Sequence, residues 1–139
     1  MKYRTSLTVL TLSLLLLGCA HSQKKIAMNL SPVEAREWLN ETQGIQLVDV
    51  RTREEYAQEH ILGSQLIPLQ ELGNRASEID KERPILLYCH SGKRSQQAAE
   101  LLKGRGFKDV HQIAGGIVAW KEKDLLVETR PAVANNPKK

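Results

Sequence analysis

Short apolar runs alternate with amphipathic segments along most of the chain. The runs at 45–50 (IQLVDV) and 84–88 (PILLY) are continuous enough to be typical of buried strands. Shorter apolar runs at 66–68 and 110–113 favour two further strands. The hydrophobic pattern therefore predicts four strands, spaced far enough apart for a helix to lie between each pair.

The segments between these runs have the signals of helices. Ser31 can cap a first helix, Pro32 suits its first turn, and Glu34 completes a capping box, while Gly44 ends the segment. Four further helices are predicted at 52–58, 69–79, 95–103 and 116–123. Strands that alternate with helices predict an α/β domain with a mainly parallel sheet.

Composition agrees with one folded domain. The chain has 139 residues, of which 41% are hydrophobic and 26% are charged. The formal net charge of +4 is spread along the chain, without a long basic run. Nucleic-acid binding is therefore not expected. No grouping of His, Cys and carboxylates suggests a metal, and no cofactor is expected.

The first residues have the pattern of an export signal. Lys2 and Arg4 precede an apolar stretch at 7–17, which is short for a membrane span. The stretch ends in LLGC, with its cysteine at Cys19, and this resembles a bacterial lipobox. The resemblance implies cleavage after residue 18, lipid on Cys19 and membrane attachment through acyl chains. An ordinary cleaved signal or a short anchor is the alternative.

The predicted division of the chain follows from that signal. Residues 1–18 are the signal peptide, 19–29 a lipidated tether, 30–127 the folded domain and 128–139 a flexible tail. Cleavage would remove two positive charges, which lowers the formal charge from +4 to +2. Ala20 follows the lipidated cysteine, and this resembles lipoproteins sent to the outer membrane of enteric-type bacteria. We therefore expect a monomeric lipoprotein that faces the periplasm.

The stretch CHSGKRS holds the second of the two cysteines, Cys89. It joins the strand at 84–88 to the start of a helix, where free backbone N–H groups favour a thiolate. Lys93 and Arg94 add positive charge, Gly92 permits a tight curve, and Ser95 is expected to cap the helix. A lone cysteine after an apolar strand is usually buried and inert. All of these features within seven residues favour a reactive thiolate in an anion-binding loop.

The pattern Cys89-x4-Arg94-Ser95 resembles the active-site loop of the rhodanese family of sulfurtransferases. Other segments agree in order, and they comprise Asp49-Val50-Arg51, Glu55-Tyr56, His60-Ile61-x-Gly63, Ile67-Pro68-Leu69, Gly115-Gly116 and Ala119-Trp120. The match covers the domain from Leu30 to Val127 and implies a parallel sheet with helices on both faces. Two positions depart from the family pattern, since Glu59 stands where glycine is common and Ser64 where alanine is usual.

The resemblance implies a double displacement. Cys89 takes a sulfane sulfur from a donor such as thiosulfate, and an acceptor such as cyanide or a thiol then takes it from the persulfide. Backbone N–H groups from His90 through Ser91 to Ser95 would stabilise the thiolate and the persulfide. Arg94, with Lys93, would hold the anionic end of the donor.

The supporting residues have more than one interpretation. Asp49 orders the loop or caps the following turn. Arg51 helps to bind anions, or it pairs with Glu54 or Glu55 on a solvated face. His90 is expected at the rim of the site rather than as a base. His60 and Trp120 are expected to be structural, and Gly115-Gly116 a tight connection rather than a phosphate cradle.

Two other function classes stay open. Phosphatases and arsenate reductases of the same fold also use a cysteine and an arginine, but the phosphatases have one more residue between the two. The shorter spacing here favours sulfur over phosphate. The second alternative is a membrane-tethered binding or sulfur-carrier module that passes persulfide sulfur to a protein partner.

Overall fold

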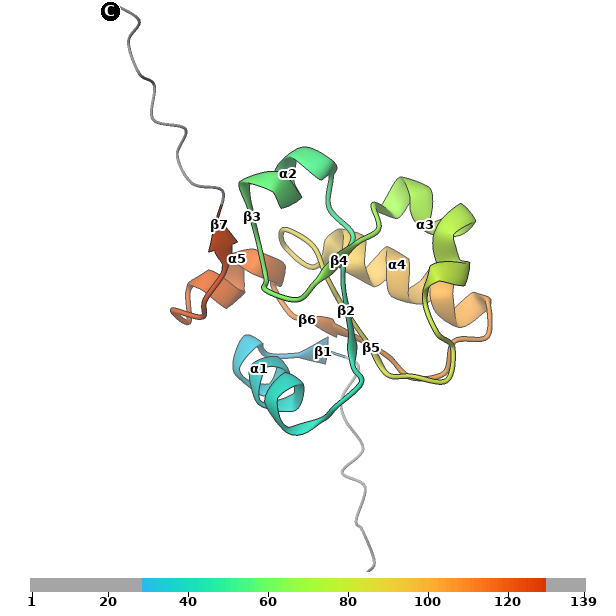
Figure 1. The fold of residues 1–139 in the computed structure, drawn as a ribbon, viewed down its shortest axis with the longest axis horizontal. Coiled ribbons are helices and arrows are strands. Elements are labelled where there is room, and N and C mark those ends of the chain that lie inside the picture. The colour runs from blue at the N-terminus through green and yellow to red at the C-terminus, as the bar shows by residue number, and fades with distance from the viewer. Residues whose placement is uncertain (1–28, 130–139) are drawn as a thin grey trace, which may run out of the picture.

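The computed structural model describes residues 29–129, and these form an α/β fold (Figure 1). The main sheet has five strands, which are β1 (Asn29–Leu30), β2 (Gln46–Asp49), β4 (Gln65–Leu66), β5 (Ile85–Tyr88) and β6 (Val110–Ile113). Their order is β1-β6-β5-β2-β4, and every neighbouring pair is parallel. The α/β fold and the mainly parallel sheet predicted from the sequence are thus confirmed.

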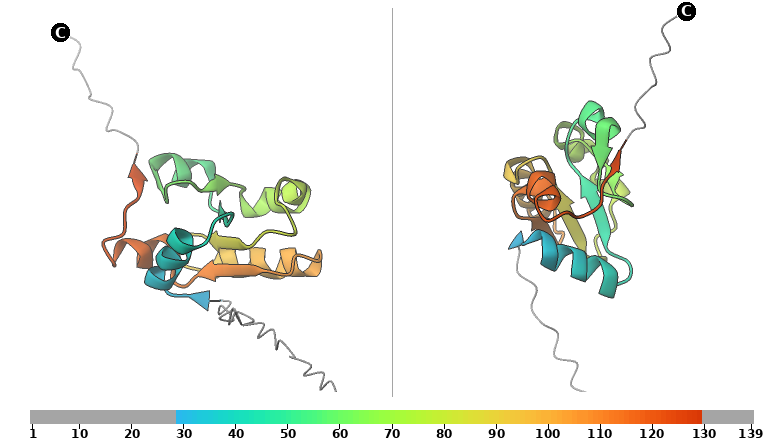
Figure 2. Two further views of the ribbon diagram at one scale, coloured as in Figure 1. Left: turned by 60° about the horizontal axis from the view of Figure 1, so that its bottom comes forward. Right: turned by 90° about the vertical axis from the view of Figure 1, so that its left-hand side faces the viewer.

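Helices cover both faces of this sheet (Figure 2). The helices are α1 (Pro32–Glu41), α2 (Arg53–Gln58), α3 (Leu69–Arg75), α4 (Lys93–Gly104) and α5 (Gly116–Lys121), with a 3-10 turn η1 (Ala76–Glu78) after α3. Buried residues of α3, η1 and α4 form one core cluster with one face of the sheet. Buried residues of α1 and α5 form a second cluster with the other face.

Strand β5 lies at the centre of the sheet and contributes to both clusters. Ile85 and Leu87 point to the α3–α4 side, whereas Leu86 and Tyr88 point to the α1–α5 side. All four side chains are at most 1% exposed. This alternation of two buried faces explains why the segment is a continuous apolar run, and it holds the residue that follows, Cys89, in a fixed position.

Apart from shifts of one to two residues at the ends of predicted elements, the structure differs from the prediction in three places. Strand β1 precedes α1, where no strand was predicted, and it spans the predicted boundary between the tether and the domain. The predicted helix at 69–79 is divided into α3 and η1. A second, two-stranded sheet pairs β3 (Glu59–His60) with β7 (Glu128–Thr129) in antiparallel register. The beginning of the predicted tail is therefore hydrogen-bonded to the domain.

The predicted signal peptide at 1–18, the lipidation site Cys19, residues 19–28 of the tether and residues 130–139 of the tail lie outside the described residues. Within 29–129, none of the helices combines the length and the apolar character that a bilayer span requires.

Candidate active site at the carboxyl ends of β2 and β5

The loop 89–95 lies at a topological switch point of the sheet. The chain leaves β2 toward β4 on one side, while it leaves β5 toward β6 on the other. Such a reversal opens a crevice beyond the carboxyl ends of the two strands. Cys89 follows β5 directly, and the segment that begins at Asp49 follows β2. The two segments that the sequence singled out are therefore brought to one edge of the sheet.

Cys89 lies at the centre of a loop of backbone amides. The amide of Gly92 donates to Cys89 Sγ at 3.1 Å, and the whole residue is 1% exposed. Burial raises the pKa of the thiol, but hydrogen bonds from Ser95, Gly92 and Ser91 outweigh burial and bring the pKa below its ordinary value. The arrangement favours a thiolate in a place where water has little access.

The first two carbonyl groups of the loop accept hydrogen bonds from backbone amides of α5, and this sets the orientation of the loop backbone. The amide of Ile117 donates to the carbonyl of Cys89 at 2.8 Å, and that of Val118 donates to the carbonyl of His90 at 3.2 Å. Gly92 supplies the expected tight curve, with φ of 98°. Carbonyls that point toward α5 leave the following amides free to point toward the sulfur, which is the geometry of an anion-binding nest.

Gly116 is the point of closest approach between α5 and the loop. Its φ is +61°, and a Cβ at this position would lie 2.6 Å from the carbonyl oxygen of His90 and even nearer to that of Cys89. The pair Gly115-Gly116 is thus a tight connection before a helix, as expected, and its second glycine lets the helix contact the loop.

Gly116→Ala is expected to lower the free energy of unfolding and to displace the loop. Gly63→Ala is the matched control, since Gly63 has φ of +81° but no atom within 4 Å of the added Cβ. We expect Gly116→Ala to cost about 1–3 kcal/mol more than the control, because only Gly116 meets a backbone that cannot move away. Urea unfolding of both variants measures the difference, and equal losses would contradict this reading of the contact.

Ser95 does not cap the helix, which corrects the prediction made for it. Helix α4 begins at Lys93, and its N-cap is Gly92 in the left-handed conformation. Ser95 instead lies buried in the first turn, with Oγ 2.7 Å from Gln112 Oε1 and 3.0 Å from the carbonyl oxygen of Gly92. The Ser95 hydroxyl has only one proton, and two oxygen acceptors already lie within hydrogen-bonding distance of it. The backbone amides of the loop are therefore the main donors to the thiolate.

Asp49 and Arg51 form a buried ion pair next to the loop. Asp49 is 0% and Arg51 2% exposed, and the Arg51 guanidinium donates to both carboxylate oxygens at 2.6–3.0 Å. Asp49 also accepts the Arg51 amide, and Arg51 donates to the carbonyl of Glu59. Burial opposes the charge on Arg51, but Asp49 outweighs it and raises the pKa of the guanidinium. The expected alternative, a solvated pair of Arg51 with Glu54 or Glu55, is therefore wrong.

A contact that sequence reasoning missed joins Arg94 to Glu55. Both terminal nitrogens of Arg94 donate to the Glu55 carboxylate, each at 2.7 Å. Glu55 belongs to α2, which follows β2, and Arg94 belongs to α4, which follows β5, so the pair joins the two segments that leave the switch point. The only signal in the sequence was the Thr52-x-x-Glu55 capping pattern, which places the carboxylate in the first turn of a helix on this side of the sheet.

The remaining loop side chains face outward. His90, Ser91 and Lys93 are exposed. His90 thus stands at the rim, where it was expected. Tyr56 stacks on His60 with ring centroids 3.9 Å apart, and buried Trp120 donates to the carbonyl of Leu126, so both His60 and Trp120 have structural contacts.

The two departures from the family pattern are accommodated without strain. Glu59 has φ of −157°, so its backbone is extended and needs no glycine. Ser64 is buried, and its hydroxyl lies 2.9 Å from the hydroxyl of Tyr88. The Tyr88 hydroxyl also accepts the Ile61 amide, so this network ties the 61–64 turn to the strand that carries Cys89.

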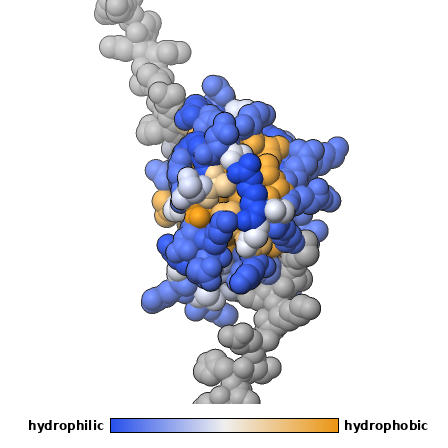
Figure 3. Space-filling view, turned by 90° about the vertical axis from the view of Figure 1, so that its right-hand side faces the viewer, coloured by the Kyte–Doolittle hydropathy of each residue, from blue (hydrophilic) through white to orange (hydrophobic). Residues whose placement is uncertain are grey.

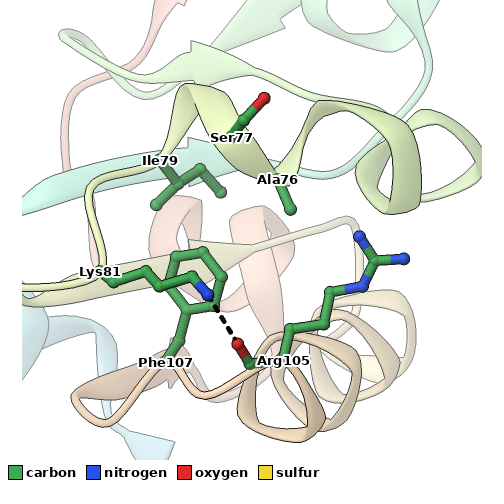
Figure 4. Close-up of a pocket in the computed structure, with 6 residues that line it drawn as sticks. All are labelled: Ala76, Ser77, Ile79, Lys81, Arg105 and Phe107. Atoms are coloured by element: carbon green, nitrogen blue, oxygen red, sulfur yellow. Dashed lines mark hydrogen bonds between the residues drawn. The ribbon is translucent and has the colours of Figure 1, made fainter.

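A hollow lies at the opposite end of α4 from Cys89. On this side of the molecule, hydrophobic residues show between hydrophilic ones (Figure 3). The volume of the hollow is about 610 Å³, and it is lined by Ala76, Ser77, Ile79, Lys81, Arg105 and Phe107 (Figure 4). Lys81 donates to the carbonyl of Arg105 across it. The hollow shares no residue with the loop. Among residues 29–129, no group of three His, Cys, Asp or Glu side chains could hold a metal ion.

Comparison with known proteins gives sulfur-handling relatives. The chain is 37% identical over 92 residues to the thiosulfate sulfurtransferase GlpE of Coxiella burnetii, a match that covers 66% of this chain and 85% of that protein. It is 38% identical over 88 residues to the putative sulfur carrier protein YrkF of Bacillus subtilis, a match that covers 63% of this chain and 48% of that protein. It is 40% identical over 93 residues to the probable adenylyltransferase/sulfurtransferase MoeZ of Mycobacterium tuberculosis, covering 66% of this chain and only 24% of that protein.

Solved structures agree with these relatives. The solution structure of the rhodanese-like domain of the Anabaena protein Alr3790 matches with a TM-score of 0.70 and 28% identity, covering 82% of this chain and 87% of that one. The family model of the rhodanese-like domain matches residues 31–123, which include β2, β5, the whole cysteine loop and α5. The chain therefore belongs to the rhodanese-like family.

Proposed function

We propose that the protein is a sulfurtransferase that carries sulfane sulfur as a persulfide on Cys89. The Cys89 thiolate attacks the outer sulfur of a donor, the donor's S–S bond breaks, and its remainder leaves with the bonding electron pair. With thiosulfate this is Cys–S⁻ + S–SO₃²⁻ → Cys–S–S⁻ + SO₃²⁻. A thiophilic acceptor, cyanide or a thiolate, then attacks the outer sulfur and restores the thiolate.

The observation that carries this proposal is the position of Cys89 Sγ at the focus of the loop amides. A buried thiolate surrounded by N–H donors is stabilised without a general base, and the same donors suit the outer sulfur of a persulfide. Lys93 and Arg94 are the cations at the entrance that a sulfane donor meets. Relatives named as sulfurtransferases support the same reaction class.

The test is the intact mass of the protein after it is mixed with thiosulfate. We expect a gain of one sulfur atom, which later addition of cyanide removes as thiocyanate is formed. Hydrolysis of an aryl phosphate serves as the control for the phosphatase alternative. Phosphate hydrolysis faster than sulfur loading would reject the proposal.

A sulfur-carrier module is the second candidate, favoured by the likeness to a protein named as a putative sulfur carrier. In this case the persulfide forms, but a protein rather than a small molecule accepts the sulfur. The 1% exposure of Cys89 suits an acceptor that must dock before transfer. Loading by thiosulfate without turnover to cyanide would distinguish the carrier from the enzyme.

We also propose that the protein is a lipoprotein, acylated at Cys19 and attached to the periplasmic side of the outer membrane. This proposal rests on the LLGC pattern after the apolar stretch at 7–17. Cys19→Ser is expected to move the protein from the membrane fraction to the soluble fraction or to block its processing. Immunoblots of fractionated cells measure the shift. Wild-type protein that washes from membranes without detergent would contradict the proposal.

A further inference from the structure

The charge of Arg94 is neutralised before any donor arrives. Its two terminal nitrogens both bind the Glu55 carboxylate at 2.7 Å, and neither side chain is more than 30% exposed. Such a bidentate pair between planar groups has a fixed geometry. Arg94 is thus held at the entrance with its strongest hydrogen-bonding edge already occupied.

Glu55 is itself held in place by the start of α2. Its carboxylate accepts the Thr52 amide at 2.9 Å, and its own amide donates to the Thr52 hydroxyl at 3.3 Å. The hydrogen bond from Arg94 is the main cause that lowers the pKa of Glu55 to about 2. The carboxylate is therefore ionised at neutral pH and remains so well into the acid range.

The charges around the loop can be counted from every element that borders it. Arg51 is paired with Asp49, and Arg94 is paired with Glu55. Lys93 is the one loop cation for which the described part of the chain supplies no ion-pair partner. Apart from the amide dipoles, one full positive charge faces an incoming donor, where the sequence alone suggested two.

A single uncompensated positive charge affects donors of different charge to different extents. Thiosulfate brings two negative charges to the Cys89 thiolate, so that three negative charges meet in the reacting complex. An alkyl persulfide brings one, in the step Cys–S⁻ + R–S–S⁻ → Cys–S–S⁻ + R–S⁻, so that two meet. Like charges that approach within a few ångströms in a poorly hydrated site repel strongly. A site with one uncompensated cation is better matched to the singly charged donor.

We propose that Glu55 is a specificity-determining residue, which biases the site away from dianionic donors and toward singly charged alkyl persulfides. This inference rests on the proposed sulfur transfer and names its donor class. Glu55 contacts Arg94 and not the reacting sulfur atoms, so it acts through the charge and position of that side chain. The predicted consequence is a shift in the ratio of two donor reactions rather than a general loss of activity.

The experiment compares the rates at which thiosulfate and 2-hydroxyethyl persulfide load Cys89. Each reaction is quenched at intervals, and the intact mass of the protein gives the loaded fraction. Wild type is expected to load faster from the persulfide. Glu55→Gln keeps the shape of the side chain, and we expect it to raise the ratio of the second-order loading rate constants, thiosulfate over persulfide, about tenfold, the effect of about 1.4 kcal/mol. The matched control is Glu54→Gln, which removes the same charge from an exposed neighbour on α2 that has no bond to the loop. Its ratio should stay within about twofold of wild type, because an exposed charge is screened.

Arg94→Gln provides a second and opposite test that does not depend on the folding of Glu55→Gln. It leaves the Glu55 carboxylate without its partner, so the ratio should fall below that of wild type. An unchanged ratio in Glu55→Gln, or an equal loss with both donors, would mean that Glu55 only positions Arg94 and would overturn the inference. Faster loading of wild type by thiosulfate would also overturn it. Absence of loading by either donor would instead reject the proposed sulfur transfer itself.

Discussion

Cys89→Ser is expected to abolish sulfur transfer and to leave the fold unchanged. A serine hydroxyl is not ionised near neutral pH, and it cannot form the S–S bond on which the double displacement depends. The substitution is nearly isosteric, and the oxygen can still accept the Gly92 amide that now donates to Sγ at 3.1 Å. We therefore expect thiocyanate formation from thiosulfate and cyanide to fall to the rate without protein.

The chain contains a matched control for this variant. It has two cysteines, and Cys19 is expected to be the lipid-bearing one, so Cys19→Ser should keep its sulfur transfer when assayed in cell extracts. Circular dichroism and urea unfolding of Cys89→Ser test that the fold is retained. Sulfur transfer that persists in well-folded Cys89→Ser would show that another group carries the sulfur, and the assignment of Cys89 would then be wrong.

The larger elements of the fold were predictable because their signals are local. The capping box of Ser31 and Glu34 is present with both of its hydrogen bonds, and α1 begins at the next residue, as predicted. The central strand β5 is buried on both faces, which is what its apolar run indicates. Strands β1, β3 and β7 were missed because each has two residues, too few to show a period, and none lies in an apolar run like the one at 66–68 that indicated the equally short β4. Their pairing partners, which are distant in sequence, determine them.

In the candidate site, too, features set by neighbouring residues were predictable and features set by distant residues were not. The cysteine loop is a contiguous stretch between a strand and a helix, so its chemistry can be inferred from adjacent residues. The Arg94–Glu55 contact joins two segments 39 residues apart, and the local capping pattern at Glu55 does not identify Arg94 as its partner. Ser95 was misassigned because a serine near a helix start suggests a cap, whereas Gly92 adopts the left-handed conformation and lets the helix begin earlier.

Asp49→Asn is expected to destabilise the domain by about 3–5 kcal/mol, because it leaves the buried Arg51 guanidinium without its counter-charge. Arg51 is 2% exposed, and its other hydrogen-bond acceptor is the carbonyl of Glu59, which is polar but uncharged. The asparagine keeps one side-chain oxygen but presents an amide group where Arg51 now donates at 2.6 Å. Urea unfolding at neutral pH measures the loss of free energy.

Two further variants distinguish the cost of leaving a buried charge unpaired from the cost of losing an ion-pair contact. Glu71→Gln breaks ion pairs with Arg53 and Arg75 at the surface, and its effect should be much smaller, because exposed pairs are screened by solvent. The double variant Asp49→Asn/Arg51→Met removes the unpaired charge and should recover part of the loss, since apolar residues can replace a buried ion pair. Arg51 also donates to the carbonyl of Glu59, and its guanidinium carbon lies 5.5 Å from the centroid of the Tyr88 ring. If the double variant is less stable than Asp49→Asn alone, the loss of these two contacts, and not the uncompensated charge, is the cause of the destabilisation.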